Sequence, residues 1–324
     1  MTDKKRKIAV LGTGNVGATT AFTLMHQGVA SEIVLVDINK EKAEGEALDL
    51  AQCALCAPAC KVWMGEYEDC ADCDIIIVTF GVGRKPGQTR LDLAKINVGI
   101  LTSTMPKVAK IAPNAIYVIV SNPVDVLTYA TIKCTNLKPE QVIGTGTLLD
   151  SNRLAEAVGA ACNVNPQNVN AYVLGEHGDA CMAPWSLCTV AGIPVKSYMK
   201  DLGISDEEMD AKLEDIYTGM VAAGSKIIKA KGATFYAIGS SVVQLVKAII
   251  ANRHTILPLS TLLNGEYGAN NMCTGVPVMV GSKGVEKIVI APLTAEEKAL
   301  FDEKNASLSN TYDALGVRDL TPAE

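Results

Sequence analysis

Three glycines near the amino end of the chain have the spacing of a phosphate-binding turn. Residues 12–17 read GTGNVG, so Gly12, Gly14 and Gly17 occupy the positions of a G-x-G-x-x-G pattern. Such a turn lets backbone N–H groups approach a pyrophosphate at the positive end of a helix. The pattern is common by itself, but here it lies between strand-like and helix-like runs, and Asp37 follows 20 residues after Gly17. The combination predicts a dinucleotide site.

Asp37 indicates which dinucleotide the turn would bind. Its carboxylate can accept hydrogen bonds from ribose hydroxyls and would repel a 2′-phosphate, so NAD is predicted rather than NADP. The alternative is a turn without a nucleotide, with Asp37 as a solvated strand end. The residues that the motif predicts to contact the cofactor are Gly12, Gly14, Asn15, Val16, Gly17 and Asp37.

One of the three histidines lies where a proton-transfer group would be expected. His177 stands in the glycine-flanked segment GEHGD, after the strand-like run AYVL, and loops of this kind often present catalytic groups. His26 follows the glycine turn on a helix-like stretch, and His254 precedes an apolar run. Both of these are expected to be packed or surface residues.

Asp150 and Arg153 stand three residues apart at the start of a predicted helix, LLDSNRLAEAVG, and therefore share one face of it. The pair could be a functional carboxylate and cation. A surface ion pair of little energetic value is the alternative, and spacing alone slightly favours it.

The elements that must position these residues follow two patterns. The first half alternates short β-branched runs with helical stretches, which predicts a doubly wound parallel sheet of Rossmann type. The second half carries capping-box patterns at Ser205 and Thr294 and a hairpin pattern around 281–284, which predict a mixed α+β region. We expect an NAD-binding domain over 1–145 and a substrate-binding, catalytic α+β domain over 146–324. The expected strands of the first half are Ile8–Leu11, Glu32–Asp37, Cys60–Met64, Asp74–Thr79 and Ala115–Val120.

Composition excludes several classes of function. The 324 residues are 48% hydrophobic and 20% charged, with a net charge of −6, so nothing in the overall charge favours a nucleic-acid partner. No apolar run reaches the length of a membrane span, and the run after the basic start is too short for a signal peptide. We therefore expect a cytoplasmic protein that acts on a small-molecule substrate, without nucleic acid or membrane.

Ordered motifs along nearly the whole chain carry a family resemblance. The chain resembles the NAD-dependent L-lactate/L-malate dehydrogenase family, and overall it is most similar to bacterial L-lactate dehydrogenases. The resemblance implies an oxidoreductase that interconverts an L-2-hydroxy acid and its 2-oxo acid, as a homodimer or homotetramer. The segments that match are GTGNVG, EIVLVD, GVGRKPGQTRLDL, SNPVDVLTYA, GTGTLLDSNR, GEHGD and KGATFYAIG.

The resemblance implies a role for each candidate catalytic residue. His177 would exchange a proton with the substrate oxygen, and Asp150 would orient and stabilise its imidazole. Arg153 would bind the substrate carboxylate through two hydrogen bonds. Arg90 would polarise the C2 carbonyl, carried on a mobile lid over 81–90. Asn122 would hold both cofactor and substrate, and Thr79 and Gly81 would also contact the cofactor.

Arg84 occupies the position where the family senses the substrate side chain. Lactate enzymes usually carry Gln there and malate enzymes Arg, so Arg84 predicts substantial oxaloacetate activity. Pyruvate would leave the guanidinium unpaired, at a cost of about 3–5 kcal/mol. The sequence around it, including Thr234, which would narrow the pocket, looks more like a lactate dehydrogenase. A dedicated L-malate dehydrogenase and a catalytically inactive NAD-binding sensor remain as alternatives.

The ten cysteines include five between Cys53 and Cys73, with C-x2-C spacings that zinc sites also use. No histidine lies among them, and the family places ordinary packing residues at these positions. We therefore expect small buried thiols and no metal site.

Two further positions predict how the enzyme responds to fructose 1,6-bisphosphate. Lactate dehydrogenases activated by it carry an Arg two residues after the carboxylate-binding Arg and a His seven before the catalytic His. Ala155 and Asn170 stand at these positions. Because neither is a cation, pyruvate kinetics with and without the bisphosphate should agree; a large decrease in KM would contradict this.

Overall fold

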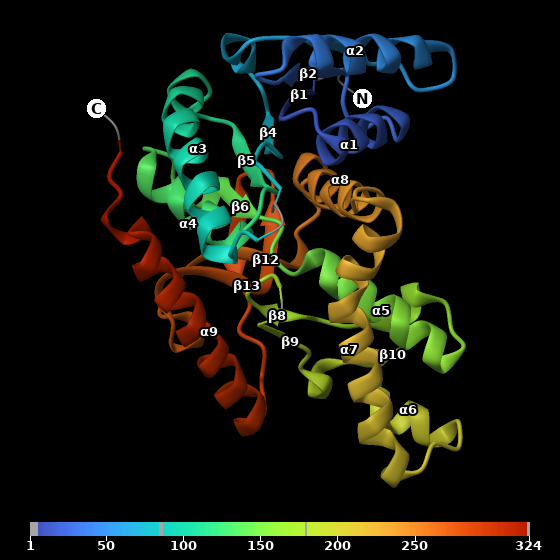
Figure 1. Cartoon of the computed structure of the whole chain (residues 1–324). Helices are drawn as coiled ribbons and strands as arrows, with labels where there is room; N and C mark the ends of the chain where they lie inside the picture. Colours follow the sequence, from blue (N-terminus) through green and yellow to red (C-terminus); the bar gives the residue numbers. More distant parts are fainter. Residues whose placement is uncertain (1–5, 84–86, 179, 323–324) are drawn as a thin grey trace.

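The computed structural model describes residues 6–83, 87–178 and 180–322. Its elements are arranged around one long sheet, with the two halves of the chain at opposite ends (Figure 1). Arg84 and the two residues after it lie outside the described residues, so the expected role of Arg84 is not examined by the structure. None of the helices in the described part is both long and apolar enough to cross a lipid bilayer.

Six parallel strands form the first half of the sheet, in the order β3-β2-β1-β4-β5-β6. The chain reverses its direction of progress between β1 and β4, which is the switch point where Rossmann folds bind dinucleotides. This confirms the predicted Rossmann fold. The strands are β1 (Lys7–Leu11), β2 (Glu32–Val36), β3 (Lys61–Met64), β4 (Ile75–Val78), β5 (Ile116–Ile119) and β6 (Val142–Gly144).

Both faces of this sheet are buried, which explains why its strands are apolar at nearly every position. Ile8 and Val10 of β1 face one hydrophobic cluster, while Ala9 and Leu11 face the other. Helices α1 (Asn15–His26), α2 (Lys40–Ala51) and α8 (Tyr236–Ile250) contribute to the first cluster. Helices α3 (Arg90–Ile111) and α4 (Val124–Cys134) contribute to the second.

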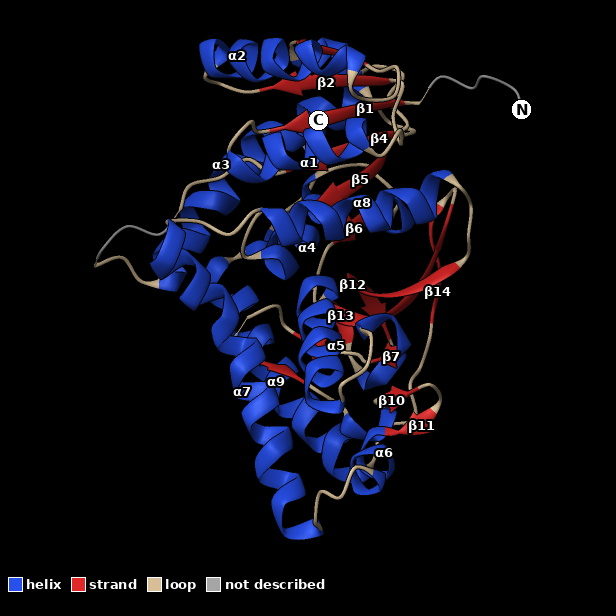
Figure 2. Cartoon of the chain, turned by 90° about the vertical axis from the view of Figure 1, so that its right-hand side faces the viewer, coloured by secondary structure: helices blue, strands red, loops and turns tan. Residues whose placement is uncertain are grey.

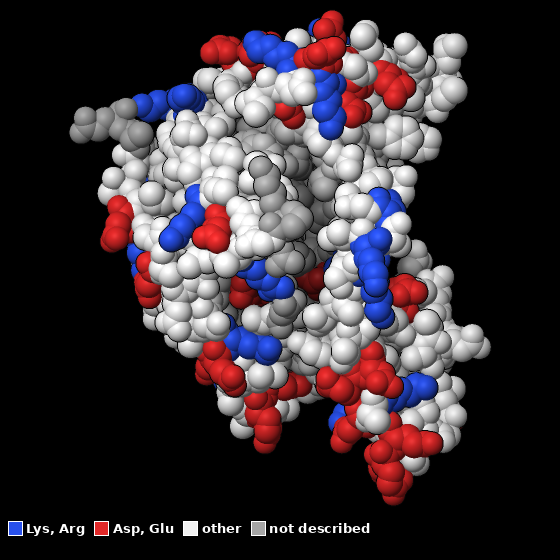
Figure 3. Space-filling model, in the orientation of Figure 1, with Lys and Arg blue, Asp and Glu red and all other residues white. Residues whose placement is uncertain are grey.

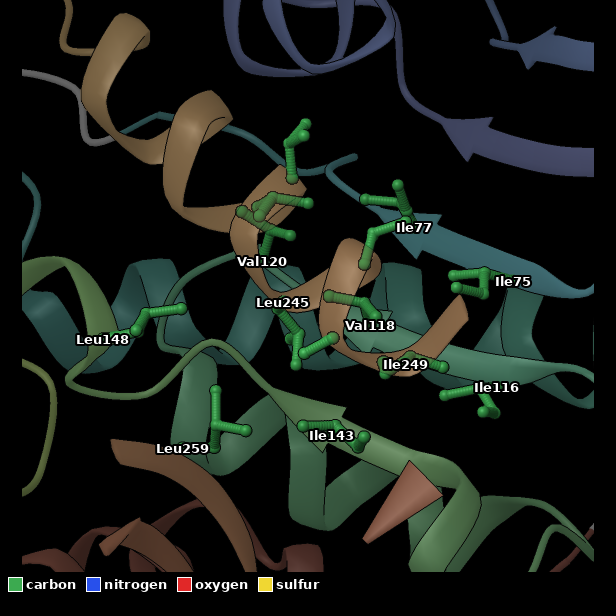
Figure 4. Close-up of a cluster of buried hydrophobic side chains, with 14 of the residues drawn as sticks. Ile75, Ile77, Ile116, Val118, Val120, Ile143, Leu148, Leu245, Ile249 and Leu259 are labelled. Atoms are coloured by element: carbon green, nitrogen blue, oxygen red, sulfur yellow. The ribbon is translucent and has the colours of Figure 1, made fainter. Parts of the chain in front are cut away.

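Helix α8 comes from the second half of the chain but packs on the sheet of the first half. Its Leu245 and Ile249 lie among the side chains of Ile116, Val118 and Ile143 (Figure 4). It also contacts α1 along much of its length. The two halves of the chain therefore share one core.

The second half extends the same sheet with antiparallel strands. β12 pairs with β6 through Ser260 and Gly144, and β13 pairs with β12, β14 and β8. The added strands are β8 (Leu174–Gly175), β9 (Cys181–Met182), β12 (Thr255–Asn264), β13 (Asn270–Gly281) and β14 (Gly284–Ile288). A separate small sheet contains β7 (Val169–Asn170), β10 (Thr189–Val190) and β11 (Ile193–Pro194). The turn between β13 and β14 confirms the predicted hairpin.

Four more helices complete this half, and α5 and α7 lie side by side in its lower part (Figure 2). They are α5 (Leu148–Cys162), α6 (Val195–Asp201), α7 (Asp206–Lys231) and α9 (Ala295–Leu315). Both predicted capping boxes are confirmed: Ser205 accepts a hydrogen bond from the Glu208 amide at 3.3 Å, and Thr294 from the Glu297 amide at 3.2 Å. Short 3-10 turns are Gln52–Leu55, Tyr67–Cys70, Pro139–Gln141, Pro166–Asn168, Trp185–Leu187, Glu266–Gly268 and Val317–Asp319.

The sheet separates the clustered cysteines from one another. Cys70 and Cys73 are buried on the α3 side, whereas Cys53 and Cys60 pack against the α1 side. Burial raises the pKa of Cys60 to about 11 and of Cys70 to about 12, so these groups are neutral thiols. Within the described ranges, no group of three or more potential ligands could hold a metal ion. The expectation of buried thiols is wrong for Cys56, which is exposed because it follows the short turn after α2.

The exposure of Cys56 predicts how the native protein reacts with thiol reagents. A chromogenic disulfide reagent should modify Cys56 fastest, the half-buried Cys53 and Cys60 more slowly, and the seven buried thiols only after unfolding, since attack needs an accessible thiolate. The C56S variant should lose the fast phase, and C53S is the matched control that keeps it. A fast phase that survives in C56S would contradict the assignment.

Candidate active site

The predicted site residues lie at one edge of the parallel sheet. Gly12, Thr79 and Asn122 follow the carboxyl ends of β1, β4 and β5, and α5 begins just after β6. Because these strands are neighbours and parallel, their carboxyl ends meet at the same edge. Figure 3 shows that this face of the molecule is hollowed between the α3–α9 side and the α7–α8 side.

The glycine turn has the geometry that its sequence predicts. Gly12 has a φ of 98°, and a Cβ there would lie 2.6 Å from the backbone nitrogen of Phe80. A Cβ on Gly17 would lie 1.9 Å from the Gly12 carbonyl oxygen. Any side chain at either position would therefore collide with backbone. Gly14 differs, because no heavy atom in the described part of the chain lies within 4 Å of its would-be Cβ.

The open space at Gly14 lies at the amino end of α1. The helix begins at Asn15, and among the described residues no side chain caps this end. Its first N–H groups and its dipole therefore suit a phosphate group. The observed turn and helix end fit the pyrophosphate of NAD, which these residues would hold.

Asp37 lies directly after β2 and is bonded to the same turn. Its Oδ2 accepts hydrogen bonds from the Thr13 amide at 2.6 Å and the Thr13 hydroxyl at 3.0 Å. Its Oδ1 accepts one from the Asn39 amide at 2.9 Å. An ionised carboxylate has about four acceptor positions, so capacity for a ribose hydroxyl remains. The hydroxyl of Thr79 donates to the Gly12 carbonyl at 2.8 Å and so holds the turn.

Asp150 joins the other two groups of the candidate catalytic set. His177 Nδ1 lies 2.6 Å from Oδ2 of Asp150, and the Arg153 guanidinium lies 3.2 Å from Oδ1. Because an ionised carboxylate only accepts, Nδ1 carries the hydrogen and Nε2 is left for the substrate. The side chains of Asp150, Arg153 and His177 are 8%, 16% and 24% exposed. The surface ion-pair alternative is therefore wrong.

The electrostatics of this set favour a charged imidazole beside a charged carboxylate. Burial alone would raise the pKa of Asp150, but the charge and hydrogen bond of His177, with Arg153, outweigh it and hold the pKa below its usual value. Burial alone would lower the pKa of His177, but Asp150 outweighs it and the pKa is raised. His177 can therefore carry a proton close to neutral pH.

The segment that leads into β8 and the His177 loop is bonded to the amino end of α5, the helix that carries Asp150. The Thr147 hydroxyl donates to the Val173 carbonyl, and the Val173 amide donates to the Ser151 hydroxyl at 2.8 Å. From the other side β13 pairs with β8 at Gly275 and Gly175. A Cβ on Gly275 would lie 2.8 Å from the Gly175 carbonyl oxygen, so the two backbones meet directly.

Three further candidates lie outside the glycine turn and the Asp150 set. Arg90 is exposed as the first residue of α3, and Thr234 is half-buried in the turn between α7 and α8. The exposed Asn122 follows β5. Their expected contacts with substrate stay predictions. Arg153 faces α7 at Gly224, where a Cβ would lie 3.7 Å from the guanidinium.

The structure adds two site residues that the sequence analysis missed. Asp125 accepts a hydrogen bond from the His177 amide at 2.8 Å. Asn97 of α3 donates to the Asn122 carbonyl at 2.8 Å and accepts from the Val82 amide at 2.9 Å, which ties two loops together. Both are buried polar residues in otherwise apolar helix faces, which was the available signal.

A Rossmann sheet with this turn, next to a histidine–aspartate pair and an arginine, defines an NAD-dependent oxidoreductase. Sequence profiles of the lactate/malate dehydrogenase NAD-binding domain and of the lactate/malate dehydrogenase α/β C-terminal domain match residues 6–144 and 147–315. The chain belongs to the lactate/malate dehydrogenase family, and NAD is its cofactor.

Individual relatives agree with this assignment. An L-lactate dehydrogenase of Thermoanaerobacter sp. (strain X514) is 44% identical over 311 residues, 96% of this chain and 99% of the relative. One from Clostridium botulinum (strain 657 / Type Ba4) is 43% identical over 313 residues, 96% of this chain and 98% of the relative. The ligand-bound crystal structure of the minor L-lactate dehydrogenase of Enterococcus mundtii has a TM-score of 0.91 at 42% identity, and covers 95% of this chain and 98% of that one.

The role of Asp150 in raising the pKa of His177 can be measured without substrate. In the D150N variant the carboxylate charge is lost, so the NMR titration midpoint of His177 should move to lower pH. His26 and His254 provide internal control signals, because they lie on other elements. An unchanged His177 midpoint would contradict the electrostatic assignment.

Proposed function

We propose that the protein is of L-lactate dehydrogenase type, with substantial activity on oxaloacetate and malate because of Arg84. The observation that carries the proposal is the carboxylate of Asp150, which binds His177 on one oxygen and Arg153 on the other. In such a set, the arginine can bind a substrate carboxylate, and the histidine can exchange a proton with the oxygen on the carbon next to that carboxylate. The names of the relatives support a 2-hydroxy acid substrate.

In the reduction, Nε2 of the protonated His177 donates its proton to the C2 oxygen of the 2-oxo acid, which becomes a hydroxyl. Bound NADH supplies the hydride that reaches C2. Asp150 keeps the Nδ1 hydrogen in place and stabilises the imidazolium before transfer. In the oxidation of the hydroxy acid, neutral His177 accepts the proton again.

Arg153 sets the position of the substrate relative to the proton donor. Its guanidinium can bind the substrate carboxylate through two parallel hydrogen bonds. Because Arg153 and the partner of His177 are one helical turn apart on α5, the distance between carboxylate site and proton donor is fixed by a rigid element. Arg90 would stabilise charge that develops on the C2 oxygen.

The proposed preference among 2-oxo acids rests on Arg84 and the sequence around it. The second carboxylate of oxaloacetate could pair with Arg84, whereas the methyl group of pyruvate could not. Against this, the named relatives are L-lactate dehydrogenases, and Thr234 would narrow the same side of the pocket. We therefore propose activity on both substrates.

The two alternatives make different predictions for purified protein. A dedicated L-malate dehydrogenase would reduce oxaloacetate and leave pyruvate almost untouched. An inactive NAD-binding sensor would bind NADH without oxidising it when 2-oxo acids are added. The presence of His177, Asp150 and Arg153 in bonded geometry supports an active enzyme.

The role of Arg84 is tested by the ratio of kcat/KM for oxaloacetate to kcat/KM for pyruvate. R84Q should lower this ratio by about 10²–10³, which corresponds to losing a pair worth about 3–5 kcal/mol. K85Q removes a charge from the adjacent position and is the matched control. If R84Q leaves the ratio within about twofold, or about 0.4 kcal/mol, Arg84 does not select the substrate.

A further inference from the structure

A buried carboxylate that the proposed mechanism does not use lies behind the catalytic histidine. Asp125 is the second residue of α4 and is 1% exposed. Burying a carboxyl group lowers the stability of the fold unless its oxygens form hydrogen bonds. Burial raises the pKa of Asp125, and the nearby Ser260 hydroxyl, together with the backbone hydrogen bond and charge of His177, opposes that rise.

Asp125 contacts the catalytic loop through its side chain and the carboxy-terminal helix through its backbone. Its Oδ2 accepts the His177 amide hydrogen at 2.8 Å. Its carbonyl oxygen accepts a hydrogen bond from the Tyr312 hydroxyl of α9 at 3.1 Å. Oδ1 makes no hydrogen bond in the described part of the chain. Within the described residues, the short side-chain hydrogen bond of Asp125 therefore goes to the backbone of His177, and the Ser260 hydroxyl lies near the same carboxyl group.

The backbone around His177 needs such an anchor. Gly175 has a φ of 92° and Gly178 a φ of 143°, and glycines restrict the chain less than any other residue. Asp150 holds the imidazole ring, but a ring held at one atom still moves with its backbone. The bond to Asp125 fixes the other end of the same residue.

We propose that Asp125 is a positioning residue that fixes the backbone of His177 while Asp150 fixes its ring. The inference rests on the proposed function, because it assigns the proton transfer to His177. The required group is a hydrogen-bond acceptor at the position of Oδ2, not a negative charge. Asparagine can supply that acceptor and alanine cannot.

The full-length D125A and D125N variants test this requirement. In D125A, kcat for pyruvate or oxaloacetate reduction should fall by about ten- to a hundredfold, because small misplacements of a catalytic group cost that much. KM for NADH should stay within about twofold, since the glycine turn is elsewhere. D125N should keep kcat within about threefold. T131A is the matched control, because Thr131 is a buried residue of α4 whose hydroxyl bonds only within the helix.

The pH profile separates positioning from general destabilisation. His177 is influenced by Asp150 and Arg153 on α5 and by Asp125 on α4, and Tyr312 and Cys273 face Asp125 from α9 and β13. A misplaced ring would lose part of its contact with Asp150. The pH above which the rate of 2-oxo acid reduction falls should therefore be lower in D125A than in the wild type, and this shift should be larger than in D125N. T131A should leave it unchanged.

The outcomes are distinguishable. If the wild-type chain does not oxidise NADH with 2-oxo acids, the proposed function fails, whatever Asp125 does. If the wild type is active and D125A retains its kcat and pH limb, the positioning role is overturned. If D125N is as impaired as D125A, the charge rather than the acceptor matters, and the inference is also overturned. If D125A does not fold, D125S replaces it, because the shorter serine side chain would not reach the His177 amide. Its kcat and pH profile are then compared with those of the wild type in the same way.

Discussion

The carboxylate of Asp150 is shared between a histidine and an arginine, and distant segments of the second half of the chain meet to form that arrangement. The charges and hydrogen bonds of the two partners together outweigh the effect of burial on the pKa of Asp150. Arg153 needs only one helical turn to reach it. His177 lies 27 residues further along and must be brought back by β8 and its pairing with β13.

The need to bring His177 to Asp150 links the two halves of the molecule. The sheet that ends in the cofactor turn continues through β6 into β12 and β13, so the cofactor and catalytic residues are placed by one continuous hydrogen-bonded element. Helix α8 adds to the coupling, because it belongs to the second half of the chain and buries Leu245 and Ile249 against the sheet of the first half. Motion between the halves would have to disturb this shared core.

Local patterns predicted much of this from the sequence. The five predicted strands of the first half are correct to within one residue at each end, and the glycine turn, both capping boxes and the α5 pair are present, but the short strand β6 was not predicted. What the sequence could not supply were contacts between distant segments. In the sequence, Asp125 and Asn97 look like ordinary helix residues. Their roles become visible only in the fold, where the His177 amide binds Asp125 and two loops meet at the side chain of Asn97. The exposure of Cys56 depended on where α2 ends, which is the least predictable property of a helix.

The contact between Gly175 and Gly275 affects how this site could evolve. Beneath the catalytic loop, main chain lies against main chain, with a carbonyl oxygen where the first atom of any side chain would go. A side chain at Gly275 would collide with that carbonyl oxygen and with the Thr147 hydroxyl, which lies 2.6 Å from the would-be Cβ, so substitution there would break the site rather than reshape it. A change in substrate range would have to come from other positions, such as Thr234 in the turn between α7 and α8. The direct backbone contact therefore limits which positions of the site can accept a new side chain.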